Sequence, residues 1–218
     1  MNNVANSFLL IYAGLFPIVN PVGGAPLFLA LTQHTTESGR HALAARVAVN
    51  GFFLLLGSLF VGSYVLEFFG ITLPVVRVGG GMVVIAFAWK LLNANEPVID
   101  RRGAVRGDSS IPPVDAFYPL TMPLTVGPGS ISVAITLGSQ RPRLPTDLEH
   151  LALLGGGAVA GIFAIAVTIF LCYRFAERIV AALGASGTNV LMRLSAFILL
   201  CIGIQIVWGG YSALIANP

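Results

Sequence analysis

The sequence predicts an all-α membrane protein with six transmembrane helices, arranged as two inverted three-helix repeats. Composition predicts the class: 56% of the 218 residues are hydrophobic, only 10% are charged, and the mean hydropathy is +0.87. A soluble domain carries about 25% charged residues, because its surface has to be polar. A weak internal repeat, described below, predicts the two halves.

Six apolar segments are long enough to cross a bilayer, since its hydrocarbon core of about 30 Å takes about 20 helical residues to span. Short clusters of charged residues separate the segments. We expect the spans at residues 7–32, 44–66, 74–94, 116–138, 151–173 and 190–212. A polar connection, 95–115, divides the chain into a first three-helix repeat, 1–94, and a second, 116–218.

The distribution of basic residues predicts the orientation. The loops and span edges after the first, third and fifth spans hold nine of the twelve Lys and Arg residues. Because Lys and Arg are enriched on the cytoplasmic side, the connection 95–115 should be a cytoplasmic loop and both termini should lie outside. The first apolar run has no basic residue before it and no small-residue cleavage pattern, so we expect a retained span and not a signal peptide.

The internal repeat involves interrupted helices. The stretch L-F-P-I-V-N-P-V-G-G, residues 15–24, has a counterpart in M-P-L-T-V-G-P-G-S, residues 122–130, and an arginine begins the third span of each half, Arg77 and Arg193. Three crossings leave the chain on the opposite membrane face, so the second copy must be inverted. Inverted repeats with broken helices at matching positions are typical of secondary transporters, whose substrates bind near the midplane.

The prolines and glycines predict breaks in the first and fourth spans. Each proline lacks the N–H that a helix needs, and freed carbonyl groups in lipid must line a polar cavity or be buried in protein. We expect half-helices from Ala25 and from Gly129, whose N-terminal ends favour anionic groups, while the carbonyl ends before the breaks suit an ammonium group or Na⁺. The candidate substrate-binding residues are Asn20, Pro21, Gly23, Gly24, Thr121, Thr125, Gly127, Pro128, Gly129 and Ser130.

The substrate should be small and zwitterionic. No Asp, Glu, Lys, Arg or His lies in the middle of any expected span, whereas an anion would recruit Arg or Lys and a cation Asp or Glu. We expect no cofactor and no metal site, because Cys172 and Cys201 stand alone, without C-x-x-C spacing or a histidine neighbour. Coupling to Na⁺ or H⁺ stays open.

Several stretches resemble the MarC family of bacterial and archaeal integral membrane proteins over nearly the whole chain, among them F-P-I-V-N-P-V-G-G-A-P, P-L-T-M-P-L-T-V-G-P-G-S-I and N-V-L-M-R-L-S-A-F. The resemblance implies a six-span protein of the inner (plasma) membrane, related to lysine-exporter-like transporters, that transports a small neutral amino acid such as glycine or alanine. Asn20 and Pro21 match the family's N-P, and residues 127–129 match its G-P-G. Gly24 departs from the pattern, since many members have a second Asn there.

Other functions stay open or are disfavoured. The cargo could instead be another small neutral metabolite or a drug, although a drug pocket should be larger and more aromatic. An intramembrane protease would need a serine with a membrane histidine, H-E-x-x-H or paired membrane aspartates, none of which occurs, so we expect no enzyme. A membrane scaffold would not require matched breaks. The basic residues form no stripe for nucleic acid, and a homo-oligomer is open.

Overall fold

The computed structural model describes residues 2–93, 115–139 and 148–216, and within these ranges every regular element is a helix. The predicted connection 95–115 lies almost wholly outside the described residues. The elements are α1 Asn2–Val19, α2 Pro21–Leu31, α3 Glu37–Phe68, α4 Leu73–Leu92, the π-helix η2 Leu120–Thr125, α5 Pro128–Ser139, α6 Leu148–Arg174 and α7 Ala176–Ala216.

The described residues contain four helices that are long and apolar enough to cross a membrane, namely α3, α4, residues Gly155–Arg174 of α6 and Ser186–Ala216 of α7. The pair α1–α2, bent by 41°, makes a fifth span if it is counted as one. The segment 116–138 is divided between η2 and α5, each too short to span alone, so a sixth span there remains a prediction.

Capping residues explain where several helices begin. Thr36 precedes α3 in an extended conformation, and its hydroxyl oxygen accepts a hydrogen bond from the N–H of Gly39 at 3.2 Å. This cap lets α3 start seven residues before the expected span at 44. α7 also starts earlier than expected, at Ala176, because its first turns form a short segment that turns into the spanning part at Gly184, where φ is +64°.

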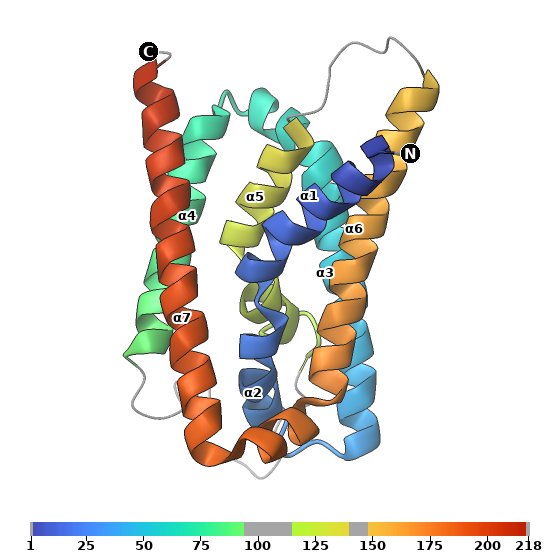
Figure 1. Cartoon of the computed structure of the whole chain (residues 1–218), viewed down its shortest axis with the longest axis vertical. Helices are drawn as coiled ribbons and strands as arrows, with labels where there is room; N and C mark the ends of the chain where they lie inside the picture. Colours follow the sequence, from blue (N-terminus) through green and yellow to red (C-terminus); the bar gives the residue numbers. More distant parts are fainter. Residues whose placement is uncertain (1, 94–114, 140–147, 217–218) are drawn as a thin grey trace.

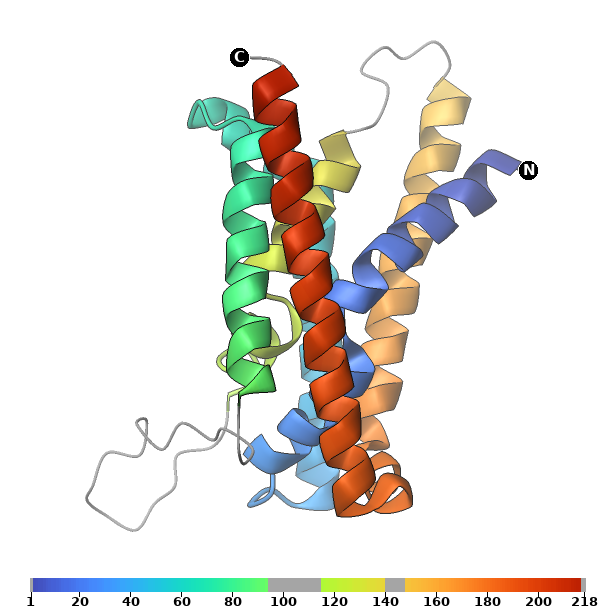
Figure 2. The ribbon, with the colours of Figure 1, turned by 60° about the vertical axis from the view of Figure 1, so that its left-hand side comes forward.

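The chain crosses the long axis of the molecule in alternating directions (Figure 1). α1 and α2 run downwards, α3 returns upwards and α4 descends, whereas α5 rises, α6 descends and the long part of α7 rises. The first half therefore begins at the upper end and the second half at the lower end. The beginning of α7 runs across the lower end before the helix turns upwards (Figure 2).

The helices form two packing groups. The main core draws its buried side chains from α1, α2, α3, η2, α5 and α6, with Leu15, Leu55 and Ile162 completely buried. α4 and α7 pack along each other and contribute a separate small cluster of Val84, Ala88 and Leu199. α4 and the long part of α7 thus rest against the main core, to which α7 contributes only Ala176, at its beginning, among the buried residues.

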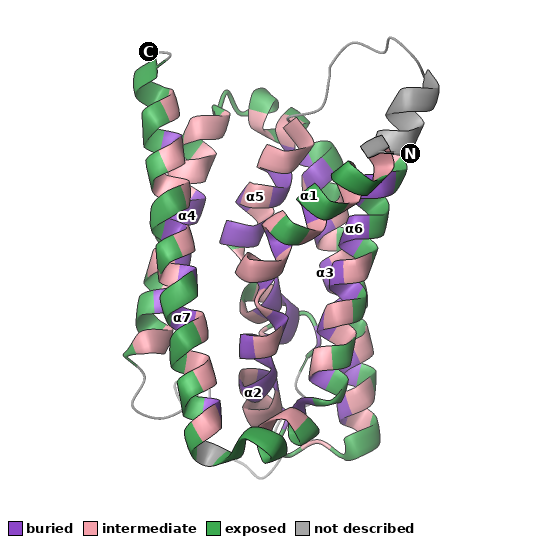
Figure 3. Ribbon diagram, viewed as in Figure 1, coloured by how far each residue is buried: buried purple, intermediate pink, exposed green. Residues whose placement is uncertain are grey.

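Burial follows the pattern of a protein solvated by lipid. Buried residues face the interior of the bundle and exposed residues cover its outside (Figure 3). The exposed side chains include large apolar ones, such as Phe68 at 84% and Trp208 at 63%. Exposed apolar surface of this extent would be unfavourable in water, so it supports the prediction that the chain spans a membrane.

Candidate functional site

The first break separates α1 from α2 at Asn20, whose backbone is left-handed with φ 46° and ψ 57°. Asparagine tolerates this conformation because its short side chain can hydrogen-bond locally. The Asn20 Oδ1 accepts a hydrogen bond from the N–H of Gly23 at 3.2 Å, and Pro21 is the first residue of α2. Asn20 is therefore the N-cap of a helix that begins in the middle of an apolar segment.

The position of this break corrects the expected one. The half-helix begins at Pro21 and not at Ala25, and Pro17 and Pro26 lie inside α1 and α2. The reason is that the left-handed turn at Asn20 ends the first helix and caps the second, whereas a proline alone need not interrupt a helix that is buried among other helices.

The second break follows η2, in which the backbone is wound more loosely than in an α-helix. The N–H groups of Thr121, Met122, Leu124 and Val126 each donate to the carbonyl oxygen five residues earlier, at 2.8 to 3.4 Å. The hydroxyls of Thr121 and Thr125 do the same, at 2.7 Å to Ala116 and Leu120. α5 then begins at Pro128, one residue before the expected start at Gly129. Both breaks lie at mid-height of the molecule (Figure 1).

The two breaks border adjoining pockets between the main core and the α4–α7 pair. The pocket at the first break is narrow, with a cavity volume of about 20 Å³, and the pocket at the second has a cavity volume of about 70 Å³. They share four wall residues, Ile18, Phe87, Leu124 and Leu199. Two segments about a hundred residues apart in the sequence are thus brought to one place.

Eight of the ten candidate residues line these pockets. Asn20, Gly23 and Gly24 line the first, and Thr125, Gly127, Pro128, Gly129 and Ser130 line the second. The other two candidates, Pro21 and Thr121, line neither pocket. Pro21 is buried, and Thr121 is completely buried and accepts a hydrogen bond from the Asn50 amide of α3 at 3.4 Å. Within the described parts of the chain, every residue that lines either pocket is uncharged.

The two helix ends differ in the donors that they offer. At α2, Asn20 itself occupies the N–H of Gly23. At α5, the first backbone hydrogen bond runs from the N–H of Ile131 to the Gly127 carbonyl at 3.1 Å, so the N–H groups of Gly129 and Ser130 precede it. The Ser130 hydroxyl donates to the same carbonyl at 2.9 Å. The pocket at the second break is therefore the better place for an anionic group, contrary to the expectation of two equivalent ends.

Sequence reasoning missed two polar residues beside the site, Asn50 and Tyr173. The completely buried Tyr173 of α6 makes a hydroxyl–hydroxyl hydrogen bond with Thr125 at 2.8 Å and stacks on Phe28 with ring centroids 4.5 Å apart. Its hydroxyl also lies where a side chain on Gly24 would be. Tyr173 thus joins α2 to the second break. Nothing in the sequence around Tyr173 indicates this contact, whereas the polar Asn50 inside an apolar span was a usable signal.

Asn20→Ala should lower the free energy of unfolding by about 1–2 kcal/mol, because it removes the cap of α2 and places alanine in a left-handed conformation. Asn20→Gly is the matched control: it also lacks the cap but adopts this backbone freely, so the loss should be only a few tenths of a kcal/mol. Thermal unfolding in detergent measures both. Equal losses in the two variants would contradict the assigned conformation.

Tyr173→Phe should cost about 1 kcal/mol, since it removes the hydrogen bond to Thr125 but keeps the stacking on Phe28. Tyr12→Phe is the comparison, because the half-buried Tyr12 hydroxyl lies 3.3 Å from the Thr168 hydroxyl and should contribute less. A double-mutant cycle with Thr125→Val measures the coupling, and a coupling energy near zero would show that the buried contact contributes nothing.

Comparison with known proteins identifies relatives along nearly the whole chain. The model of the MarC family of integral membrane proteins matches residues 5–215. The UPF0056 membrane protein YvbG of Bacillus subtilis is 30% identical over 94% of both chains. The UPF0056 inner membrane protein MarC of Escherichia coli O1:K1 is 28% identical over 90% of each, and the UPF0056 membrane protein of Pyrococcus abyssi is 27% identical over 96% of each. No solved structure matches the chain significantly.

Proposed function

Because the chain belongs to the MarC family of integral membrane proteins, we propose that it is a secondary transporter that moves a small neutral amino acid, such as glycine or alanine, across the inner membrane by alternating access. The observation that carries the proposal is the pair of helix breaks at Asn20 and Gly127, which border adjoining pockets with uncharged walls. Among the described residues, no His, Cys, Asp or Glu lines either pocket, which favours transport over catalysis.

The pockets suit a zwitterion because they offer donors at one side and acceptors at the other. The carboxylate would accept hydrogen bonds from the N–H groups of Gly129 and Ser130, at the positive end of the α5 dipole. The ammonium group would lie toward the end of α1, where Ile18 and Val19 line the pocket and the last carbonyl groups of the helix have no helical donor. The apolar walls at Val84 and Phe87 leave room for a small side chain.

The packing of the helices supports an inverted repeat of three spans. Exchanging the halves pairs α1–α2 with η2–α5, α3 with α6, and α4 with α7. Under this exchange, the contacts of α1–α2 with α6 become those of η2–α5 with α3, and the contact of α2 with α7 becomes that of α5 with α4. The contacts of α4 with α7 and of α3 with α6 map onto themselves. We therefore keep the division into repeats 1–94 and 116–218.

The α4–α7 pair is the element that we expect to move. The pockets lie between this pair and the main core, and the buried residues Val84, Ala88 and Leu199 of the pair form a cluster of their own, separate from the main core. Rocking of the pair would open the pockets to one side and then to the other. The distribution of Lys and Arg favours a cytoplasmic lower end in Figure 1, with both chain ends outside.

Ligand binding tests the proposal. Glycine, alanine and serine in millimolar excess should raise the melting temperature of the purified protein, because a ligand that binds only the folded state stabilises it. Glutamate and lysine should leave the melting temperature unchanged, since the walls hold no charge to balance theirs. The amino-acid assignment fails when the neutral amino acids give no shift or when glutamate and lysine give the same one.

A further inference from the structure

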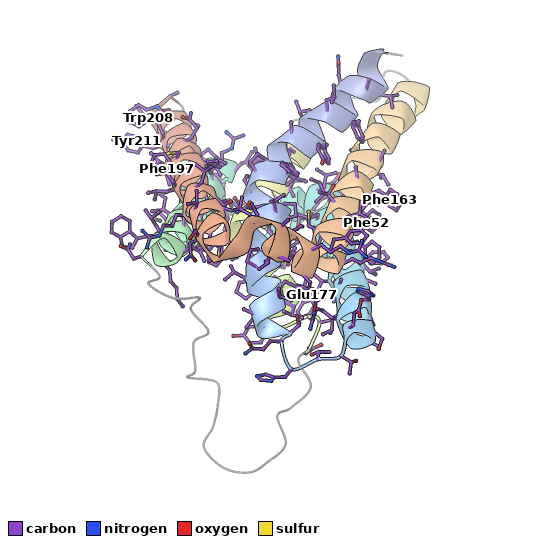
Figure 4. The ribbon with its side chains drawn as sticks, turned by 60° about the horizontal axis from the view of Figure 1, so that its bottom comes forward. Phe52, Phe163, Glu177, Phe197, Trp208 and Tyr211 are labelled. Atoms are coloured by element: carbon purple, nitrogen blue, oxygen red, sulfur yellow. The ribbon has the colours of Figure 1, made fainter. Side chains whose placement is uncertain are left out.

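We propose a second binding site, for the phosphate of an anionic phospholipid headgroup, in a pocket at the lower end of the molecule. This pocket lies where α6 ends and α7 begins, next to the start of α3, and it has a cavity volume of about 240 Å³. Figure 4 shows Glu177, one of its residues, at this end of the molecule. The site is independent of the proposed transport function.

The first step of the argument is the number of cations in the pocket. Arg40, Arg174 and Arg178 all line it. Arg40 is largely buried and pairs with Glu177, and its guanidinium also donates to the Thr35 carbonyl at 3.2 Å. Arg40 therefore already has a partner and ties the start of α3 to the start of α7.

The second step is that the other two arginines have no acidic partner among the residues that the structure describes. The carboxylate of Glu177 is taken by Arg40, and Glu37 lies 4.0 Å from His41. Within the described parts of the chain, neither Arg174 nor Arg178 forms an ion pair. Two like charges in one pocket repel each other, so an anion between them would be stabilised.

The third step is that aromatic rings hold both guanidinium groups in place. Arg174 lies 6.0 Å and Arg178 5.3 Å from the centroid of the same ring, that of Phe175, and Arg174 is also 5.6 Å from the ring of Phe170. These contacts orient the planar groups without neutralising them. Guanidinium groups fixed in this way can each donate two hydrogen bonds to phosphate oxygens.

The surroundings favour a lipid over a free anion. Arg174 is the last residue of the apolar stretch Gly155–Arg174, so its guanidinium lies at the edge of the membrane-spanning region. Beside it, Leu171 is 45% and Phe175 37% exposed, which offers apolar surface to the acyl chains of a lipid whose phosphate is in the pocket. Basic pockets at the cytoplasmic edge of membrane helices are typical sites for anionic lipids.

Titration of the purified full-length protein with short-chain lipids tests the site. Dihexanoylphosphatidylglycerol should raise the melting temperature, whereas dihexanoylphosphatidylcholine, whose headgroup has no net charge, should not. In Arg174→Gln/Arg178→Gln the apparent affinity for the phosphatidylglycerol should fall at least about tenfold, since two charge-assisted contacts are lost. Arg46→Gln is the control, because Arg46 is exposed on α3 and does not line the pocket, and it should bind as the wild type does.

Three results would overturn the lipid site: equal shifts with both lipids, equal losses in Arg46→Gln and the double variant, or the same shift from inorganic phosphate at the same concentration. The last result would indicate a site for free anions. If the double variant does not fold, the single variant Arg178→Gln serves instead. The Arg178 side chain is exposed, so it can be replaced without disturbing the core. This variant should bind phosphatidylglycerol several-fold more weakly than the wild type. Unchanged binding would count against the site.

Discussion

Gly138→Ala is expected to destabilise the protein by about 3 kcal/mol or more, or to prevent its folding. Gly138 lies on α5 where this helix crosses α3, and an added Cβ would overlap the backbone carbonyl group of Leu59. A backbone atom cannot be moved aside by a change of rotamer, so the two helices would have to separate. At Gly62 of α3 the Ile135 side chain of α5 likewise occupies the place of an added Cβ, so the two helices already lie close together at a second point of their crossing.

The yield of monodisperse protein and its melting temperature measure this effect. Gly57→Ala is the matched control, because Gly57 lies on α3, is exposed and has no atom within 4 Å of an added Cβ. There the substitution should stabilise the helix by up to about 1 kcal/mol, since alanine favours a helix more than glycine does. Similar melting temperatures for the two variants would contradict the described packing of α3 on α5.

Gly127→Leu is expected to weaken the binding of neutral amino acids by about a hundredfold or more while the protein still folds. Gly127 lines the pocket at the second break, and the nearest atom to an added Cβ is the Pro123 carbonyl oxygen at 3.3 Å. The Cβ therefore meets only this one atom, in a tight contact, and the rest of a leucine side chain would enter the space proposed for the substrate. Isothermal titration with alanine, together with the melting temperature, separates loss of binding from loss of folding.

Gly156→Leu is the control for this substitution. Gly156 lies on α6, is exposed, has no atom within 4 Å of an added Cβ and lines neither pocket. It should bind alanine as the wild type does. Gly129 is a poorer choice for the test, because an added Cβ there would overlap Val84 and would disturb the packing of α4 on α5.

Hydropathy was enough to predict most of the helices. The expected spans at 44–66 and 151–173 lie inside α3 and α6, and the span at 74–94 coincides with α4 to within two residues. These segments are uninterrupted apolar runs, so their length and composition determine where they lie. The early start of α7 could not be predicted in this way, because the charged residues Arg174, Glu177 and Arg178 mark this stretch as a connection between two spans.

The broken segments were predicted in kind but not in detail. Asn-Pro marked the first break correctly, yet the exact position depends on the left-handed conformation of Asn20, which no pattern of prolines specifies. In the second broken segment, the hydroxyls of Thr121 and Thr125 donate hydrogen bonds to carbonyl groups five residues earlier. These bonds favour a π-helix where an α-helix was expected. Tyr173 was missed because its contact with Thr125 depends on tertiary packing between α6 and η2.

Uptake of radiolabelled alanine into proteoliposomes tests the central claim most directly, namely that the two facing breaks form one transport site for a small neutral amino acid. The driving force is an imposed Na⁺ or H⁺ gradient, or exchange against internal alanine. The wild type and Gly156→Leu should accumulate labelled alanine, and unlabelled glycine should compete with it. Gly127→Leu should accumulate no more label than protein-free liposomes do. Uptake by Gly127→Leu at the rate of the wild type, or no uptake by the wild type under any of these conditions, would contradict it.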